Sequence, residues 1–263
     1  MRDELEFARE LADIADEIAM RHFSHDPATS IKADGTLVTV ADREIERALR
    51  EAIRARFPAH AILGEEGGLH GDSSAPAWVI DPIDGTNNFA WGIPIFGTLI
   101  GLRIAERMEI GMVSAPALGE RYEAGRGDGA RMNGSTIHVS EVSSLSEARI
   151  CYGGWSYWAE GGLEERWAAT LRQCRRSRGF GDFWGHMLVA RGAAEVMAEP
   201  DLQLWDVAGF ELIVEEAGGR VTDFEGRTFT RRGSCLTTNG LFHEEILARL
   251  SGHRAQTPLG RSY

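Results

Sequence analysis

The N-terminal part of the chain shows apolar residues at helical spacing. Over residues 3–23 one apolar stripe is formed by Leu5, Ala8, Leu11, Ile14, Ala15 and Ile18. Residues 41–56 repeat this spacing, so both segments are predicted to be amphipathic helices. Between them, residues 30–42 (SIKADGTLVTVAD) predict a loop or hairpin arm that turns around Asp34-Gly35.

After residue 60 the pattern changes to short apolar runs separated by glycine-rich turns, which is typical of strands. The runs are AILGEEGG, AWVIDPIDGT, FGTLIGLRIAERMEIGMVSAP and ERYEAGRGDGARMNGSTIHVS, with RGDGARMNG as a hairpin connection. Helical spacing then returns, and we predict helices over 163–174, 183–198, 206–217 and 243–250, with a short strand over 220–223. Because strands and helices do not alternate strictly, the pattern predicts layers of an α+β fold rather than a doubly wound sheet.

Length and charge narrow the possible functions. With 263 residues, 43% of them hydrophobic, the chain can bury the core of one large domain or of two closely packed lobes. Its net charge of −12 argues against nucleic acid or an anionic membrane as partner. The same charge repels an anionic substrate, so a phosphate site in this chain needs local positive charge, which a bound metal ion would supply.

Cysteine usage and the N-terminus indicate the cytoplasm. The three cysteines are far apart and form no CxxC pair, so neither a zinc site nor a disulfide framework is expected. Acidic residues interrupt the apolar positions of the N-terminal segment, and no apolar run reaches the length of a membrane span. We therefore expect a cytoplasmic protein without a signal peptide.

The stretch WVIDPIDGTNNF, residues 78–89, places two carboxylates at the end of an apolar run. Trp78 to Ile80 indicate the end of a buried strand, and Pro82 is expected to turn the chain. Asp81 and Asp84 on such a turn repel each other unless a cation lies between them, and a hard divalent cation takes oxygen ligands. The following Gly-Thr is expected to open a helix with N–H groups that face a phosphate. A plain β-turn is the alternative.

Three further acidic segments lie beside apolar runs. Asp42 and Asp206 each stand at the start of a predicted helix, where an aspartate is also a common cap. Glu65 and Glu66 follow an apolar run, where a solvated turn is the alternative to a metal ligand. If the four segments meet, two cations about 4 Å apart could clamp the attacking and leaving oxygens of an in-line displacement.

Three motifs resemble the signatures of the inositol monophosphatase superfamily: GEE at 64–66, DPIDGT at 81–86 and WDVAG at 205–209. Residues 32–42 also resemble the mobile metal-binding arm of these proteins, and the match runs in order over about 5–250. The resemblance implies a layered αβαβα sandwich of the inositol monophosphatase and fructose-1,6-bisphosphatase type. It further implies a Mg²⁺-dependent, Li⁺-sensitive phosphatase with two or three ions in each active site.

The resemblance also assigns the metal ligands. The first metal would be held by Glu65, Asp81 and the Ile83 carbonyl, the second by Asp81, Asp84 and Asp206, and a weaker third by Asp42 with Glu65. Glu66 would contact these ligands rather than the metal ions. Lys32 lies where the arm could approach the site, and a solvated lysine is an equal alternative.

The same comparison implies the catalytic and phosphate-binding residues. Thr86, with Glu65 and Asp42, matches the group that orients and deprotonates the attacking water. Gly85 and Thr86 match the residues whose N–H groups face the phosphate. No covalent phospho-enzyme is required by this scheme.

The expected substrate follows from the segments 113–119, 178–184 and 198–206, which resemble the histidinol-phosphatase branch of the superfamily. Asp182 stands where inositol phosphatases carry a small residue against the polyol, and Glu199 aligns with a substrate-contacting glutamate. L-Histidinol phosphate carries a protonated amine and an imidazole, which carboxylates would bind. We therefore expect Asp182, Glu199, Asp206 and Arg178 to bind the substrate, with an inositol or small sugar phosphate as the alternative.

Structural readings of the same residues remain open. Asp182 could cap the helix that follows it, and Glu199 could pair with Arg178. His186 stands at helical spacing in an apolar stretch, which favours a packed histidine over a ligand. Phe183 and Trp184 are expected in the core or at a subunit interface.

Two other classes of protein remain as rivals. The acidic loops could hold structural Ca²⁺, although the EF-hand spacing is absent. The aromatic residues Trp155, Tyr157 and Trp158 could instead form the patch of an interaction module.

The predicted organisation is one domain over 1–263, with an N-terminal lobe over about 1–140, a C-terminal lobe over about 141–252 and a frayed tail over 253–263. The expected partner is a small-molecule phosphomonoester, and the resemblance implies a homodimer.

Overall fold

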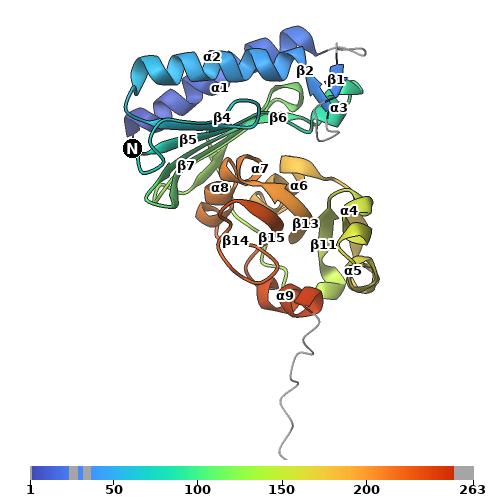
Figure 1. The fold of residues 1–263 in the computed structure, drawn as a ribbon. Coiled ribbons are helices and arrows are strands. Elements are labelled where there is room, and N and C mark those ends of the chain that lie inside the picture. The colour runs from blue at the N-terminus through green and yellow to red at the C-terminus, as the bar shows by residue number, and fades with distance from the viewer. Residues whose placement is uncertain (1, 24–28, 32–36, 252–263) are drawn as a thin grey trace, which may run out of the picture.

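The computed structural model describes residues 2–23, 29–31 and 37–251 (Figure 1). The helices are α1 (Arg2–His22), α2 (Val40–Arg56), α3 (Thr86–Ala90), α4 (Trp155–Glu160), α5 (Glu164–Leu171), α6 (Asp182–Ala190), α7 (Leu204–Ala208), α8 (Glu211–Glu216) and α9 (His243–Ser251), with 3₁₀ turns at Pro116–Leu118 and Leu145–Glu147. The strands are β1 (Thr29–Ile31), β2 (Leu37–Thr39), β3 (Ala61–Gly64), β4 (Gly68–His70), β5 (Ala77–Asp84), β6 (Gly97–Ile104), β7 (Arg107–Ala115), β8 (Glu120–Gly125), β9 (Ala130–Met132), β10 (Ser135–Thr136), β11 (Arg149–Tyr152), β12 (Arg176–Arg178), β13 (Val196–Gln203), β14 (Arg220–Thr222) and β15 (Arg232–Thr238).

Two large sheets alternate with three layers of helices, and β1 pairs with β2 in a separate two-stranded sheet (Figure 1). The first sheet has the order β10-β9-β8-β7-β6-β5-β3-β4, and the second has the order β12-β11-β13-β15-β14. Helices α1 and α2 cover the outer face of the first sheet, α6, α7 and α8 lie between the sheets, and α4, α5 and α9 cover the far face of the second. The five layers confirm the predicted α+β sandwich of αβαβα type.

The predicted apolar stripes form the outer core. Ile45, Leu49 and Ile53 on α2 are fully buried against α1 and the first sheet. Burial of such aliphatic side chains stabilises the fold by about 1.5–3 kcal/mol each. The hairpin predicted around RGDGARMNG is also present, because β8 pairs antiparallel with β9 across residues 126–129.

Strand β5 corrects the prediction that the chain turns at Pro82. The strand continues to Asp84, and its pairing with β6 shifts between Asp81 and Asp84: Asp81 faces Leu99, whereas Asp84 faces Gly97. Three steps along β5 therefore match two along β6, which is a β-bulge, where a proline is tolerated. Without the bulge, positions three apart would face opposite sides of the sheet.

Two predicted helices in the second half differ from the structure. The helix predicted over 183–198 ends at Ala190, where Gly192 has a φ of +72° and Ala193 N–H donates to the Leu188 carbonyl at 2.8 Å. This glycine-closed end is a common helix stop, and residues after 195 instead enter β13. A short apolar run does not distinguish a buried strand from a buried helix.

The helix predicted over 206–217 is two helices, α7 and α8, with a break at Gly209-Phe210. A Cβ on Gly209 would lie 2.7 Å from the Leu99 Cβ of β6, so this break packs closer to the first sheet than any other residue type permits. Helix α7, with Asp206, thereby packs against the end of β5 and the beginning of β6.

Candidate active site

The acidic segments predicted from the sequence converge on one end of the first sheet. They come from the start of α2 (Asp42), the turn after β3 (Glu65 and Glu66), the bulge of β5 (Asp81 and Asp84) and α7 (Asp206). Carboxylate oxygens of Asp81, Asp84 and Asp206 lie within 4.8 Å of one another, and so do those of Asp42, Glu65 and Glu66. The structure therefore brings together every carboxylate that was expected to bind metal.

Asp42 is both a cap and a residue of the site. Its Oδ2 accepts hydrogen bonds from Thr39 N–H at 2.8 Å and Thr39 Oγ1 at 2.5 Å, which closes a capping box at the start of α2. Its Oδ1 faces Thr86 Oγ1 at 3.5 Å. The two interpretations of Asp42, as a cap and as a site residue, are therefore compatible, because the capping box uses one oxygen while the other faces Thr86.

Asp206 likewise combines a capping bond with a place in the site, at the start of α7. Its Oδ2 accepts the Gln203 N–H at 2.7 Å in a second capping box, while the residue also belongs to the group with Asp81 and Asp84. Both capping boxes fix the orientation of a carboxylate through the local backbone, so the helices α2 and α7 aim their aspartates before any ion binds.

Asp84 also caps a helix, although it lies far from that helix in the sequence. Its Oδ2 accepts the Phe183 N–H in the first turn of α6 at 2.5 Å. Asp81 is almost fully buried, and its Oδ1 has no hydrogen-bond partner. A buried unpartnered carboxylate oxygen costs free energy unless something absent from the protein itself satisfies it.

Burial and mutual repulsion disfavour the ionised forms of this group. Loss of hydration raises the pKa of Asp81 and Asp84 well above the ordinary value, and neighbouring carboxylates raise both further. Burial likewise raises the pKa of Asp206 to about 7 and that of Asp42 to about 6. Among the described residues no Arg, Lys or His forms an ion pair with Asp81, Asp84 or Asp206. The donor set and its charge therefore fit divalent cations, which prefer carboxylate oxygens.

Thr86 lies between the two carboxylate groups. Its hydroxyl donates to the Ile83 carbonyl at 2.8 Å and lies 3.5 Å from Asp42 Oδ1. Gly85, with a φ of +78°, precedes the first residue of α3, and a Cβ there would lie 2.9 Å from the Ile95 carbonyl. The glycine is therefore required for the sharp passage from β5 into α3 that presents Thr86 to the site.

A buried ion pair that was not among the sequence predictions supports the Glu65-Glu66 turn. Glu46 on α2 accepts the N–H groups of Glu66 at 2.7 Å and Gly67 at 2.8 Å, and it pairs with Arg50 at 2.7 Å. The i, i+4 spacing of an acidic and a basic residue on α2 was the only available signal. Lys32 of the predicted arm lies outside the described residues.

Asp182 faces the site from the start of α6, but it does not cap that helix. The N-cap residue of α6 is Gly181, and the Oδ2 of Asp182 accepts from Asn88 Nδ2 at 3.1 Å rather than from an N–H group of the helix. Asp182 has a φ of +58°, the left-handed region that is unfavourable for side chains other than Asn and Asp. The capping alternative is therefore wrong, and an aspartate suits this left-handed backbone, which would strain most other residues. No local pattern in the sequence points to Asn88, which is 94 residues away.

Glu199 on β13 lies next to Asp182. Its Oε1 faces the Asp182 N–H at 3.4 Å, and its Oε2 lies 3.2 Å from Nε2 of the fully buried His186. Burial raises the pKa of Glu199 and that of Asp182 to about 7. The alternative pair of Glu199 with Arg178 is not formed, because Arg178 is exposed and donates to the Ser177 carbonyl at 2.8 Å.

The aromatic residues serve mainly the core. Phe183 is buried between the sheets, and Trp184 packs partly against the same cluster. Trp158 is fully buried and stacks on Trp167 with ring centroids 4.5 Å apart. Only Trp155 and Tyr157 of the suggested aromatic patch are exposed, so the structure weakens the interaction-module hypothesis.

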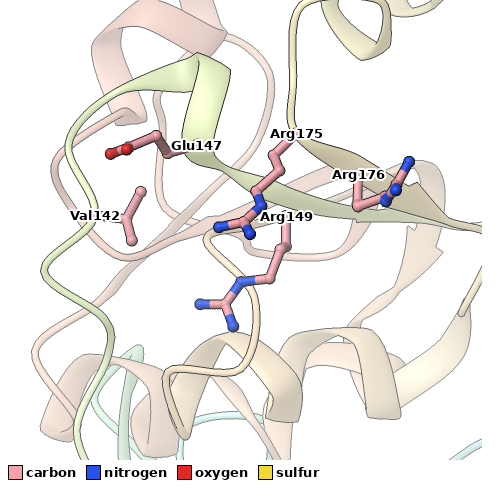
Figure 2. A pocket seen from close by; sticks show the side chains of 5 residues that line it. All are labelled: Val142, Glu147, Arg149, Arg175 and Arg176. Atoms are coloured by element: carbon pink, nitrogen blue, oxygen red, sulfur yellow. The ribbon is translucent and has the colours of Figure 1, made fainter.

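A separate hollow of about 750 Å³ lies in the C-terminal half, at the start of β11 and β12 (Figure 2). Its lining residues are Val142, Glu147, Arg149, Arg175 and Arg176. Three arginines and one glutamate give this hollow the opposite charge to the acidic site, so it does not fit a divalent cation.

None of the helices in the described part of the chain has the length and apolar character of a membrane span.

Comparison with known proteins agrees with this geometry. The model of the inositol monophosphatase family matches residues 1–255. The chain is 40% identical over 255 residues to a protein of Mycobacterium tuberculosis named histidinol-phosphatase, a match that covers 95% of this chain and 98% of that protein. A histidinol-phosphatase of Streptomyces coelicolor is also 40% identical, over 259 residues, with 95% and 97% covered. The solved structure of the Thermotoga maritima IMPase superposes with a TM-score of 0.86 at 32% identity and covers 95% of this chain and 97% of that chain.

Proposed function

The chain belongs to the inositol monophosphatase family, and from this premise we propose that it hydrolyses L-histidinol phosphate to L-histidinol and phosphate. Membership makes it a phosphoric monoester hydrolase, and the finer question is which alcohol it releases. The half-buried Asp182 and the buried Glu199, beside the predicted metal ligands, are the observation that carries the answer.

We propose that the acidic group binds two or three Mg²⁺ ions. Asp81, Asp84 and Asp206 would hold one site, Glu65 with Asp81 and the Ile83 carbonyl a second, and Asp42 with Glu65 a weaker third. Bound there, the ions would polarise the phosphoryl group, lower the pKa of water and neutralise the leaving oxygen. The unpartnered Asp81 Oδ1 supports the assignment, and so does the lack of an Arg, Lys or His ion pair with Asp81, Asp84 or Asp206 among the described residues.

The protein residues would orient the nucleophile. The Thr86 hydroxyl is held between Ile83 O and Asp42 Oδ1, so its position is fixed before substrate binds. We propose that Thr86, with Glu65 and Asp42, orients the attacking water and takes up its proton. Attack in line then forms the new P–O bond as the bond to the leaving oxygen breaks, and that oxygen takes a proton from a second water. Phosphate is released without a covalent enzyme intermediate.

The N–H groups of Gly85 and Thr86 are proposed to bind the phosphate. They begin the short helix α3, directly after the bulge that carries Asp81 and Asp84. The phosphate would thus lie between the backbone of α3 and the metal ligands, and Glu66 would support the ligands through the turn that Glu46 holds.

The alcohol part of the substrate is proposed to lie against Asp182, Glu199 and Asp206. A polyol offers hydroxyl groups, which do not compensate buried negative charge, whereas an ammonium or imidazolium group does. The relatives named histidinol-phosphatase, 40% identical to this chain, support the same choice. Arg178 is exposed at the end of β12, and its predicted contact with substrate remains a prediction.

The test is phosphate release from L-histidinol phosphate and from inositol 1-phosphate, measured side by side in Mg²⁺ and in EDTA. We expect a strong preference for L-histidinol phosphate that disappears in EDTA. Equal rates, or a preference for inositol 1-phosphate, would overturn the substrate assignment in favour of a general or inositol monophosphatase. Activity that survives EDTA would overturn the metal assignment.

We further propose a cytoplasmic homodimer that acts in histidine biosynthesis. The low cysteine content supports the cytoplasmic location, and the proposed substrate supports a role in histidine biosynthesis. The family resemblance supports the dimer. The division into lobes at about residue 140 is likewise a proposal, which the assignment of β3–β10 and β11–β15 to different sheets supports.

A further inference from the structure

His186 is a buried titratable residue that the scheme above does not use. It lies on α6, is fully buried, and stacks on Phe210 with ring centroids 3.9 Å apart and an interplanar angle of 13°. Both ring nitrogens have partners: Nδ1 lies 2.7 Å from Thr237 Oγ1, and Nε2 lies 3.2 Å from Glu199 Oε2. The ring therefore bridges Thr237 on β15 and Glu199 on β13, the carboxylate that we assign to substrate binding.

The hydrogen-bond pattern defines the state of this ring. Burial lowers the pKa of His186 to about 3, so the imidazole is neutral and has one N–H. If Nε2 carries the proton, it donates to the Glu199 carboxylate, while Nδ1 accepts the hydroxyl proton of Thr237. The Thr237 hydroxyl can donate or accept, so it selects no tautomer alone. An ionised Glu199 can only accept, and it therefore selects the Nε2–H form.

The other oxygen of Glu199 faces the site. Oε1 lies 3.4 Å from the Asp182 N–H, and a Cβ built on Gly153 would collide with this same oxygen. Gly181 also lies close, since a Cβ there would be 3.5 Å from Oε1. One carboxylate oxygen is thus bound by His186, and the other lies among backbone atoms at the edge of the substrate site.

We propose that His186 is a positioning residue that sets substrate selectivity: its Nε2–H holds Glu199 so that Oε1 receives the cationic end of the substrate. This inference rests on the proposed function, because it concerns the same carboxylate. His186 touches neither the phosphate nor the metal ligands, so its loss affects binding of the alcohol part and not the displacement at phosphorus.

The variants are His186→Phe and His186→Gln. Phenylalanine keeps the stack on Phe210 but removes the N–H, whereas glutamine retains an N–H donor. Three quantities are measured for each: the affinity for L-histidinol by calorimetry, kcat and KM for L-histidinol phosphate, and kcat/KM for p-nitrophenyl phosphate, which has no cationic group. Thr237→Val provides a third variant that removes the partner of Nδ1 and leaves the imidazole in place.

We expect His186→Phe to weaken L-histidinol binding by about tenfold or more and to raise the KM for L-histidinol phosphate by the same factor, as loss of a hydrogen bond to a buried charge predicts. Its kcat and its p-nitrophenyl phosphate hydrolysis should stay within about twofold of wild type, and His186→Gln should restore most of the binding. Thr237→Val should weaken L-histidinol binding less, by about threefold.

Two results overturn the inference. One is unchanged L-histidinol binding in His186→Phe, or in Thr237→Val if the phenylalanine variant does not fold. The other is an equal loss on both phosphate esters, which indicates a merely structural role. Failure of the proposed function looks different: wild-type enzyme that hydrolyses p-nitrophenyl phosphate but neither binds L-histidinol nor hydrolyses its phosphate overturns both together.

Discussion

Two sets of buried or half-buried carboxylates occur in this molecule, and their partners differ. Glu46 and Glu195 are buried beside arginines: Glu46 pairs with Arg50 at 2.7 Å, and Glu195 pairs with Arg149 at 2.5 Å. Each also accepts backbone N–H groups, from Glu66 and Gly67 for Glu46 and from Arg149 for Glu195. In this set each carboxylate has a counter-charge and both of its oxygens are bonded.

The aspartates of the active site form the second set. Asp81, Asp84 and Asp206 lie within 4.8 Å of one another, and each pKa is raised, first by burial and then by its neighbours. Backbone N–H groups bond one oxygen of Asp84 and one of Asp206, but no cation among the described residues pairs with them. The fold therefore positions these carboxylates without neutralising them, which distinguishes a binding site from a structural ion pair.

The largest expected effect comes from removal of one charge in the second set. Asp84→Asn keeps an oxygen that can accept the Phe183 N–H, so the protein should stay folded. Turnover should fall by about 10³-fold or more, because a metal ligand contributes several kcal/mol to the stabilisation of the transition state. Steady-state kinetics in Mg²⁺ measure the loss of turnover, and thermal unfolding in EDTA tests whether the variant stays folded. Full activity in this variant would show that the metal assignment is wrong.

Metal and pH should act together on stability. In metal-free protein the folded-state pKa of Asp206, about 7, and that of Asp42, about 6, lie above the unfolded values near 4. Such groups add most to the free energy of unfolding below pH 4, and this stabilisation is lost as the pH rises through 6 to 7. We expect the free energy of unfolding in EDTA to fall from pH 5 to pH 8.

Mg²⁺ should oppose that fall, because cations compete with protons for the same oxygens. At about 100 times its dissociation constant the ion should add about 2.7 kcal/mol. Urea unfolding at several pH values, with Mg²⁺ and with EDTA, gives both curves. Glu211, whose pKa burial raises to about 7, titrates in both, so the difference between the curves reports the cluster. Parallel curves would mean that Mg²⁺ does not bind these carboxylates.

The matched change in the paired set is Glu195→Gln. An amide would place an NH₂ group against donors from Arg149 or Ser140, so we expect a loss of about 2 kcal/mol of stability. Dependence of activity on Mg²⁺ should not change. Chemical denaturation and a Mg²⁺ titration of activity check the two expectations, and a shifted Mg²⁺ requirement would remove the distinction between the two sets.

The smallest effects are expected at Asp182. Asp182→Asn keeps the acceptor for Asn88 and tolerates the left-handed backbone, so it should preserve stability and reduce the preference for L-histidinol phosphate over inositol 1-phosphate by about tenfold. Asp182→Ala should also lose about 1 kcal/mol of stability from backbone strain. For both variants, competition kinetics measure the substrate preference and thermal unfolding measures the stability. An unchanged preference in both variants would exclude Asp182 from substrate recognition.

The sequence predicted the elements whose signals are local. The stripes at Ile45 and Leu49 and the buried run at Trp78–Ile80 are helix and strand as expected, because their spacing is set by the element itself. The bulge at Pro82 was missed, since a proline after a strand predicts a turn unless the neighbouring strand is known.

Positions of the acidic residues were predicted, but their connections were not. The bond from Phe183 N–H to Asp84 spans 99 residues, and that from Asn88 to Asp182 spans 94. Such contacts depend on the packing of α6 between the two sheets, which no local pattern specifies. The contact of His186 with Glu199 was hidden in the same way, since a histidine in an apolar stretch is usually no more than packed.

The most direct test of the account is the number of divalent ions that bind to the metal-free protein. Mn²⁺ serves as a spectroscopic substitute for Mg²⁺, and equilibrium dialysis of wild type and Asp84→Asn counts the ions per chain. We predict at least two ions for wild type and at least one fewer for the variant. Equal binding by both proteins, or no binding at millimolar Mn²⁺, would contradict the claim that these uncompensated carboxylates form the metal site.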